Sequence, residues 1–248
     1  MRLKLIACKA MFREISYLAA TCKNFIDVTY LQQGLHDVPK LLNRVLQDEI
    51  DRVESGKDLY TYNAKFTTQK FDAILLGYGL CSNGAVGLHA KHHPLVIPKV
   101  HDCISLLLGS REKYNEEFSA HCGTYWYSAS WIENGGTPSE QSEREMKKKY
   151  AEKYGEENAD FLYEAEVLHN YNRCAYIHWP ELAFPEYERY TEDAAAYLGW
   201  DYAKVDGTSG MLRDFLDGKW DERFLYVKPG QKVAPDYDTD DVLCVEDL

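Results

Sequence analysis

Short apolar segments that alternate with helical patterns are the feature that most constrains this chain. Residues 3–7 (LKLIA), 71–76 (FDAILL) and 95–100 (LVIPKV) are compact apolar runs, each followed by a turn and a helical pattern. Residues 38–53 carry apolar side chains at helical spacing, which predicts a helix that covers the sheet. Strands that alternate with helices form βαβ units, so we expect an α/β fold: a mainly parallel, Rossmann-like sheet with helices on both faces.

The second half of the chain repeats this alternation less regularly. Residues 139–169 are highly charged and helical in character, and helices are also expected at 187–198 and 211–216. The predicted strands are 124–128, 174–179, 202–205 and 224–227. We expect a single α/β domain over residues 1–248, with two similar lobes, 1–122 and 123–232, as the alternative and the acidic segment 233–248 as a loosely held tail.

Charge and hydropathy narrow the classes of partner. The chain has 28 Lys and Arg and 40 Asp and Glu, which gives a formal net charge of −12. Proteins that bind nucleic acids or anionic membranes present basic surfaces instead. No apolar run approaches the roughly 18 residues that span a bilayer. The first residues form a strand-like run, which does not match a secretory leader. The sequence therefore predicts a cytoplasmic protein that binds neither nucleic acid nor membrane, and it leaves the oligomeric state open.

The cysteines argue against a disulfide framework. Their number is odd, their spacing is uneven, and no leader directs the chain to an oxidising compartment. Each thiol is therefore a candidate core residue, nucleophile or metal ligand. The seven positions are 8, 22, 81, 103, 122, 174 and 244.

Three of these thiols follow predicted strands of the first half. Cys8 ends the first run, Cys81 follows the second through a short glycine loop, and His101 and Cys103 follow the third. Because ligands bind beyond the carboxyl ends of parallel strands, these four side chains should converge at one edge. Three sulfurs and an imidazole suit Zn²⁺, or an iron–sulfur cluster.

Two alternatives remain beside this metal set. Any single cysteine is more often a small buried residue than a ligand. His101 and Cys103, two residues apart, could also bind a metal with Cys174 or Cys81 as the third ligand. The fourth position would then stay open and could hold a substrate thiol as thiolate.

The glycine loop GYGLCSNG is the second candidate site. It matches neither the dinucleotide-binding nor the phosphate-loop motif. Its backbone could still approach an anion or a cofactor carboxylate, and a tight turn after the strand is the alternative. The candidate cofactor-binding residues are Gly77, Gly79, Asn83 and Gly84.

Three stretches, GYGLCSNG, LVIPKVHDCISLLLGSREKY and GTYWYSASWIE, resemble the family called domain of unknown function 1638. The resemblance covers nearly the whole chain. It implies a protein of methanogens and anaerobic bacteria, often encoded beside corrinoid-dependent methyltransferases and their corrinoid proteins. The residues that match the family pattern are Cys8, Gly77, Gly79, Cys81, Asn83, Gly84, His101, Asp102, Cys103, Gly109, Ser110, Arg111, Tyr114, Thr124, Tyr125 and Trp131.

Two functions from different classes follow from the residues and the resemblance together. The first is a metal-binding enzyme or accessory factor of anaerobic one-carbon metabolism that acts on a thiol, a methyl group or a corrinoid. The second is a non-catalytic module that stores or delivers a metal or cofactor to a methyltransferase system. Both would use Cys8, Cys81, His101 and Cys103, and both imply a corrinoid protein or a methyltransferase as partner.

Overall fold

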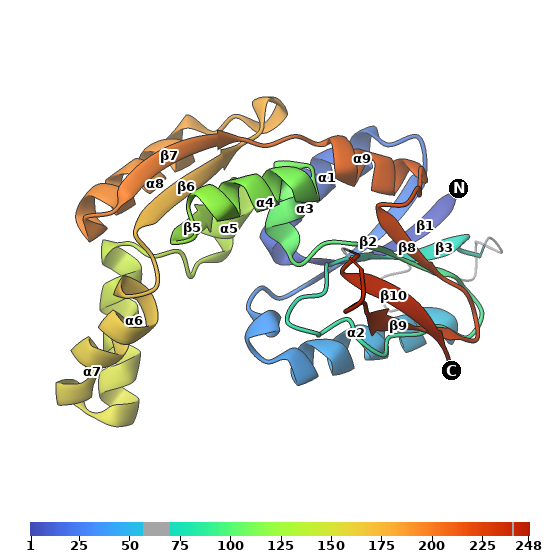
Figure 1. The fold of residues 1–248 in the computed structure, drawn as a ribbon, viewed down its shortest axis with the longest axis horizontal. Helices are drawn as coiled ribbons and strands as arrows, with labels where there is room; N and C mark the ends of the chain where they lie inside the picture. Colours follow the sequence, from blue (N-terminus) through green and yellow to red (C-terminus); the bar gives the residue numbers. More distant parts are fainter. Residues whose placement is uncertain (57–69, 240) are drawn as a thin grey trace. The chain divides into compact units, whose positions relative to one another are not determined.

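A computed structural model describes residues 1–56, 70–239 and 241–248 of the chain (Figure 1). It contains two compact units. The first comprises Met1–Ser110 together with Ser209–Leu248, and the second is Arg111–Thr208. The boundaries of these units differ from those of the two lobes expected at 1–122 and 123–232, because the chain returns to the first unit after Thr208.

The first unit is built on a five-stranded sheet in the order β2-β1-β3-β4-β8 (Figure 1). Strands β1 to β4 run parallel, as predicted, and the edge strand β8 runs antiparallel to β4. The three runs expected to be neighbours are therefore adjacent strands in the same direction. The strand bounds are Arg2–Cys8 for β1, Phe25–Leu31 for β2, Ala73–Gly77 for β3, Leu95–Pro98 for β4 and Phe224–Val227 for β8.

Helices cover both faces of this sheet, as the apolar runs predicted. Helix α2 lies on one side, and α1 and α9, which contact each other, lie on the other (Figure 1). Leu42, Leu46 and Ile50 on α2 are fully buried, which confirms the predicted apolar stripe. The helices of this unit are α1 (Phe12–Thr21), α2 (Pro39–Glu54), α3 (Cys103–Leu108) and α9 (Gly210–Asp217), with 3-10 helices at Lys9–Met11 and Leu35–Asp37.

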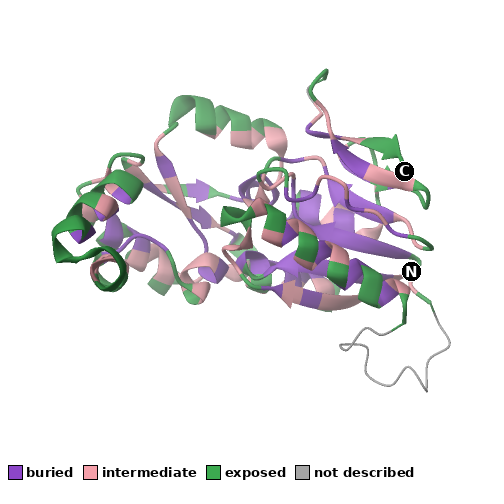
Figure 2. Cartoon of the chain, turned by 90° about the horizontal axis from the view of Figure 1, so that it is seen from below, coloured by how far each residue is buried: buried purple, intermediate pink, exposed green. Residues whose placement is uncertain are grey.

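Strands β1, β3 and β4 of this sheet are buried on both faces, and Figure 2 shows much of the sheet in the colour of buried residues. A charged side chain interrupts the apolar interior. Lys4 on β1 is 1% exposed, and its Nζ donates a hydrogen bond at 2.8 Å to Asp27 Oδ1 on β2. The pair is therefore a largely buried ion pair between β1 and the edge strand β2.

The described part of the segment expected to be a loose acidic tail contains regular structure. Strands β9 (Gln231–Pro235) and β10 (Leu243–Asp247) form an antiparallel hairpin. Val233 and Leu243 are almost fully buried in it. These apolar side chains anchor the hairpin despite the acidic residues around them.

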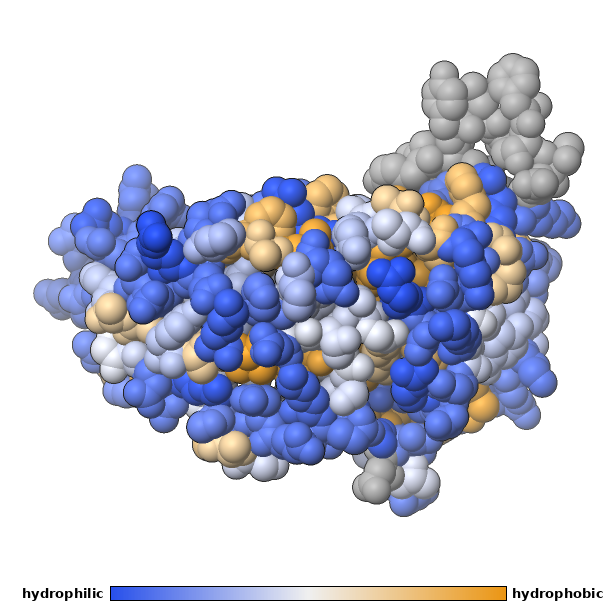
Figure 3. Space-filling model, turned by 90° about the horizontal axis from the view of Figure 1, so that it is seen from above, coloured by the Kyte–Doolittle hydropathy of each residue, from blue (hydrophilic) through white to orange (hydrophobic). Residues whose placement is uncertain are grey.

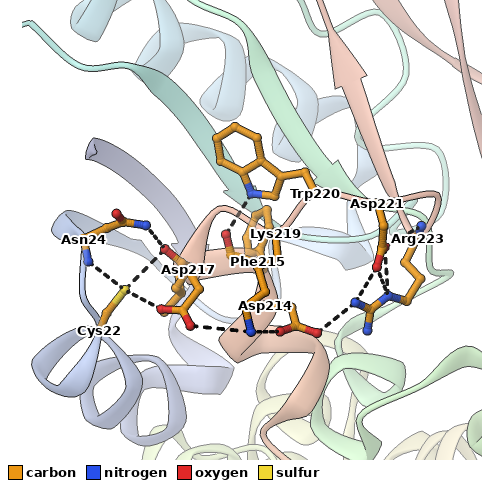
Figure 4. Close-up of polar contacts among 10 residues, drawn as sticks. Cys22, Asn24, Asp214, Phe215, Asp217, Lys219, Trp220, Asp221 and Arg223 are labelled. Carbon is orange, nitrogen blue, oxygen red and sulfur yellow. Dashed lines mark hydrogen bonds and ion pairs between the residues drawn. The ribbon is translucent and has the colours of Figure 1, made fainter.

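A polar network fixes the turn between α9 and β8 (Figure 4). Asp214 accepts hydrogen bonds from Arg223 Nη2 at 2.8 Å and from Lys219 Nζ at 2.9 Å. Asn24 Nδ2, from the loop before β2, donates to the Leu216 carbonyl oxygen at 2.8 Å. The returning chain is thus tied to the first unit by side chains as well as by strand pairing.

The second unit contains a parallel three-stranded sheet in the order β5-β6-β7, which confirms three of the predicted strands. Tyr127, Cys174, Tyr176, Ala194 and Ala195 form its core, with α8 packed on β6 and β7. Its strands are β5 (Thr124–Tyr127), β6 (Arg173–His178) and β7 (Asp201–Asp206). Its helices are α4 (Arg111–Ala120), α5 (Ala129–Asn134), α6 (Glu140–Tyr154), α7 (Glu156–Tyr163) and α8 (Pro185–Leu198), with a π-helix at Glu164–Leu168 and a 3-10 helix at Pro180–Leu182.

The surface drawn in Figure 3 is mainly polar. On the face drawn in Figure 3, hydrophilic residues predominate and apolar residues are scattered among them. In the part of the chain that the structure describes, no helix is both long enough and apolar enough to cross a bilayer.

Candidate functional site

Cys8 lies at the carboxyl end of β1, where the strand passes into the 3-10 helix Lys9–Met11. The parallel register pairs Ala7 with Gly77 at the end of β3, so Cys8 and Tyr78 follow side by side. A Cβ on Gly77 would lie 2.8 Å from the Ala7 Cβ, closer than two such atoms can approach. The glycine therefore allows these two strand ends to lie close together.

The loop after β3 is fastened to the segment after β4 through its backbone. The N–H of Leu80 donates to the Val100 carbonyl at 2.9 Å, and that of Cys81 donates to the His101 carbonyl at 2.9 Å. A Cβ on Gly79 would lie 2.4 Å from the Val100 oxygen, so only glycine permits this approach. These contacts bring Cys81 beside the segment that leads to Cys103.

Three consecutive residues of this loop have left-handed backbone conformations, with φ of +47° at Cys81, +56° at Ser82 and +68° at Asn83. Left-handed conformation costs an ordinary L-residue about 1–2 kcal/mol, and only Asn among the three tolerates it readily. Strain of this kind persists where the surrounding structure imposes it, and it is frequent at functional sites.

Contacts with α2 hold the residues that follow this turn. Asn43 Nδ2 donates to the carbonyl oxygens of Gly84 at 3.0 Å and Val86 at 2.7 Å. A Cβ on Gly84 would lie 2.6 Å from a methyl carbon of Leu42. The glycine loop is thus pressed onto the helix, and its glycines serve close packing within the protein.

Cys103 is the first residue of α3. The preceding Asp102 caps this helix, since its Oδ1 accepts hydrogen bonds from the N–H groups of Ile104 at 2.9 Å and Ser105 at 3.4 Å. N-capping by aspartate typically stabilises a helix by about 1 kcal/mol. The cap fixes where the helix begins and therefore where the Cys103 side chain lies.

The three thiols that follow β1, β3 and β4 influence one another electrostatically. Burial, then Cys8, Asp102 and Cys81, raise the pKa of the Cys103 thiol well above its ordinary value. The pKa of Cys81 is raised to about 12, first by burial and further by Asp102 and Cys8. Burial also raises the pKa of Cys8. All three are therefore protonated thiols near neutral pH, close enough for a charge on one to disfavour a charge on the next.

Solvent access differs among these thiols. Cys8 is buried, whereas Cys81 and Cys103 are half-buried. The pKa values of the Cys81 and Cys103 thiols are high because the sulfur atoms are densely packed, although part of each residue's surface is open to water.

Tyr78 completes the cluster. Its side chain is 4% exposed, and its hydroxyl is buried without a well-formed hydrogen bond. Burial is the main cause that raises the pKa of this phenol far above its ordinary value, followed by Cys8, Cys81 and Cys103. The phenol is thus close enough to the three thiols for their charges to affect its pKa. We call Cys8, Tyr78, Cys81 and Cys103 the thiol cluster.

The other candidate residues differ from this cluster in their burial. His101 and Asn83 are exposed, and Cys174 is fully buried in the core of the second unit. Across the described ranges 1–56, 70–239 and 241–248, no group of three or more His, Cys, Asp or Glu side chains is arranged to hold a metal ion. The sequence analysis missed Tyr78, for which the one available signal was its position directly after the strand-ending Gly77.

Comparison with known proteins identifies a family but no activity. The family model described as "Protein of unknown function (DUF1638)" matches residues 30–216. The chain belongs to this family. The match includes Cys81 and Cys103 and begins after Cys8. No curated protein and no solved structure matches the chain.

Proposed function

We propose that this member of the family binds a thiophilic metal ion through Cys8, Cys81 and Cys103, with Zn²⁺ as the first choice and an iron–sulfur cluster as the second. The observation that carries the proposal is the convergence of three thiols from three adjacent parallel strands. Thiolate sulfur is the protein ligand that zinc and iron–sulfur clusters share.

The donor chemistry fits such an ion, although the side chains must move to hold it. In the structure the thiols are protonated and raise one another's pKa. A divalent cation reverses this balance, since its charge favours the thiolate form of every ligand. Binding then requires release of the thiol protons and rotation of the three side chains toward one point.

Three sulfur ligands leave a fourth position for another group. His101, two residues from Cys103, is exposed and would have to turn inward to fill it. If it stays outside, the position is open to an external thiol, which bound zinc would hold as a nucleophilic thiolate. This chemistry and the family resemblance together support a role in anaerobic one-carbon metabolism. The protein would act on the thiol, a methyl group or a corrinoid, and its partner would be a methyltransferase or a corrinoid protein.

A delivery function is the second candidate. The half-buried state of Cys81 and Cys103 favours it, because handing an ion to a partner requires solvent access to its ligands. An enzyme would keep its metal in the presence of a competing apo-protein and turn over a thiol substrate. A delivery module would instead transfer the metal to the acceptor and show no turnover.

Metal content tests the proposal. Protein purified without oxygen should carry about one equivalent of zinc or the iron of one cluster. Cys103→Ser should lower this content to well under half. Cys244→Ser is the matched control and should leave it unchanged, since Cys244 lies on β10 and its thiol donates to the Pro235 carbonyl. Wild-type protein with less than about a tenth of an equivalent of any transition metal would overturn the proposal.

A further inference from the structure

A small hollow in the second unit is lined by the start of helix α6 and by one face of helix α8. Its volume is about 240 Å³. Pockets that hold drug-sized ligands measure roughly 300–1,000 Å³, so this hollow admits only a small molecule or ion. The chemistry of its lining side chains indicates which kind.

The α8 side of the hollow consists of two tyrosines with a small residue between them. Tyr190, Ala194 and Tyr197 recur at helical spacing and therefore lie on one stripe of the helix. At 1.5 Å per residue the two tyrosines are about 10 Å apart along the helix axis, and Ala194 leaves the space between them open. The Tyr190 hydroxyl is 3.1 Å from the hydroxyl of the buried Thr137, which holds this ring in place.

The charged side chains that line the hollow are all carboxylates. Asp193 on α8 and Glu140 on α6 contribute them, and none of the described lining residues is basic. Glu140 pairs with Arg144, one turn further along α6, whereas Asp193 has no ion-pair partner among the described residues. A concave surface with charges of one sign raises the local concentration of ions of the opposite sign, here cations.

The start of α6 does not turn the hollow into an anion site. The N–H of Ser142 donates to Ser139 Oγ at 3.2 Å, and the N–H of Ser139 donates to Ser142 Oγ at 2.8 Å. This capping box engages backbone donors that would otherwise be available to an anion. Glu140 adds a negative charge to the same turn, so the hollow favours a cation.

We propose that this hollow binds a small alkylammonium ion between the rings of Tyr190 and Tyr197, with Asp193 as the countercharge. Aromatic faces attract organic cations electrostatically, and aromatic side chains recognise quaternary ammonium groups in this way. A quaternary nitrogen has no N–H to donate, so aromatic rings and a nearby carboxylate are the groups suited to hold it. The site belongs to the second unit alone and does not depend on metal binding by the thiols.

Titration of the full chain with tetramethylammonium chloride, followed by amide NMR spectra, tests the site. We expect saturable shifts of the amide signals around Ala194, with a dissociation constant in the millimolar range, because cation–π contacts at partly exposed rings are weak. Sodium chloride at equal ionic strength should not produce these shifts. tert-Butyl alcohol, an uncharged molecule of similar size, should not produce them either.

Variants of the aromatic wall have a closely matched control. Tyr197→Leu should weaken tetramethylammonium binding by about fivefold, because it removes one of the two rings. Tyr154→Leu should leave binding unchanged, since Tyr154 is 49% exposed, against 48% for Tyr197, but lies outside the hollow.

Variants of the carboxylate have a matched control of the same charge change. Asp193→Asn should weaken binding by about two- to fivefold, the range typical of exposed ion pairs. Glu192→Gln removes an equal charge from the next residue of α8, outside the hollow, and should have a much smaller effect. All four replaced side chains are exposed, so the variants should fold like the wild type.

Three results would overturn the proposal. The first is a set of shifts that stays linear up to about 100 mM tetramethylammonium, which would mean that no site exists. The second is equally tight binding of tert-butyl alcohol, which would make the hollow an apolar site without preference for a cation. The third is an equal loss of affinity in Asp193→Asn and Glu192→Gln, or in Tyr197→Leu and Tyr154→Leu, which would place the cation outside the hollow.

Discussion

The left-handed turn at Cys81–Asn83 predicts that replacing Ser82 by glycine stabilises the protein. Ser82 has φ of +56° and is exposed, so the change removes little except the hydroxyl and the Cβ. The Cβ is what makes left-handed backbone costly, by about 1–2 kcal/mol. Glycine offsets part of this gain, because it loses about 0.4–1 kcal/mol more conformational free energy on folding. The net expectation for Ser82→Gly is a rise in the unfolding free energy of roughly 0.8 kcal/mol.

Urea unfolding of metal-free protein measures this change. Ser82→Ala is the control, because alanine keeps the Cβ and its strain while also losing the hydroxyl. The glycine variant should unfold at a higher urea concentration than the alanine variant, which should match wild type. Asn83→Gly should gain less, since asparagine tolerates left-handed backbone better than serine. A glycine variant that is less stable than the alanine variant would show that the turn is not strained in solution.

Two further predictions concern the charges of the first unit. Asp27→Asn should lower the unfolding free energy by about 1–3 kcal/mol, because it removes one charged partner of the buried Lys4 ammonium. Replacing both residues by apolar ones should cost less, and equal losses in the single and double variants would refute this. Burial raises the pKa of the Asp214 carboxyl, but hydrogen bonds from Arg223 and Lys219 outweigh it and hold the pKa below its ordinary 3.8. A carboxyl whose pKa is lower in the folded protein than in the unfolded chain stabilises the fold above the unfolded pKa, and this stabilisation is lost as pH falls. Arg223→Ala should therefore make the unfolding free energy fall less steeply below about pH 4. An unchanged dependence of the unfolding free energy on acid pH would contradict this prediction.

The parallel core of the first unit was predictable because its strands are buried on both faces. Runs such as 3–7 and 71–76 are almost wholly apolar, and this pattern is typical of parallel strands covered by helices. The antiparallel strand β8 was not predictable in the same way. Its four residues, Phe224–Val227, are equally apolar, and their direction depends on how the chain returns from the second unit.

The convergence of Cys8, Cys81 and Cys103 also followed from the strand pattern, since side chains at the ends of adjacent parallel strands share one edge. The expected position of His101 relied on an extended segment, in which residues two apart lie on one face. Helix α3 begins at Cys103, so the alternation ends there and His101 is left exposed.

Tyr78 and the left-handed turn lay beyond the reach of the sequence. A tyrosine after a strand is ordinary core material, and only the register of β1 and β3 shows that Tyr78 follows its strand beside Cys8. Of the residues at 81–83, only Asn83 has a propensity for left-handed backbone. The turn arises from tertiary contacts, in which Asn43 and Leu42 on α2 hold Gly84.

X-ray absorption at the zinc edge of protein reconstituted without oxygen tests the central claim most directly, because it reports which atoms surround the metal. Binding by Cys8, Cys81 and Cys103 predicts a shell of three sulfur atoms at about 2.3 Å, with one lighter atom completing it. Cys81→Ser should reduce the number of sulfur atoms, and Cys244→Ser should not. A shell of nitrogen and oxygen alone would contradict the claim and return the three cysteines to the role of core residues.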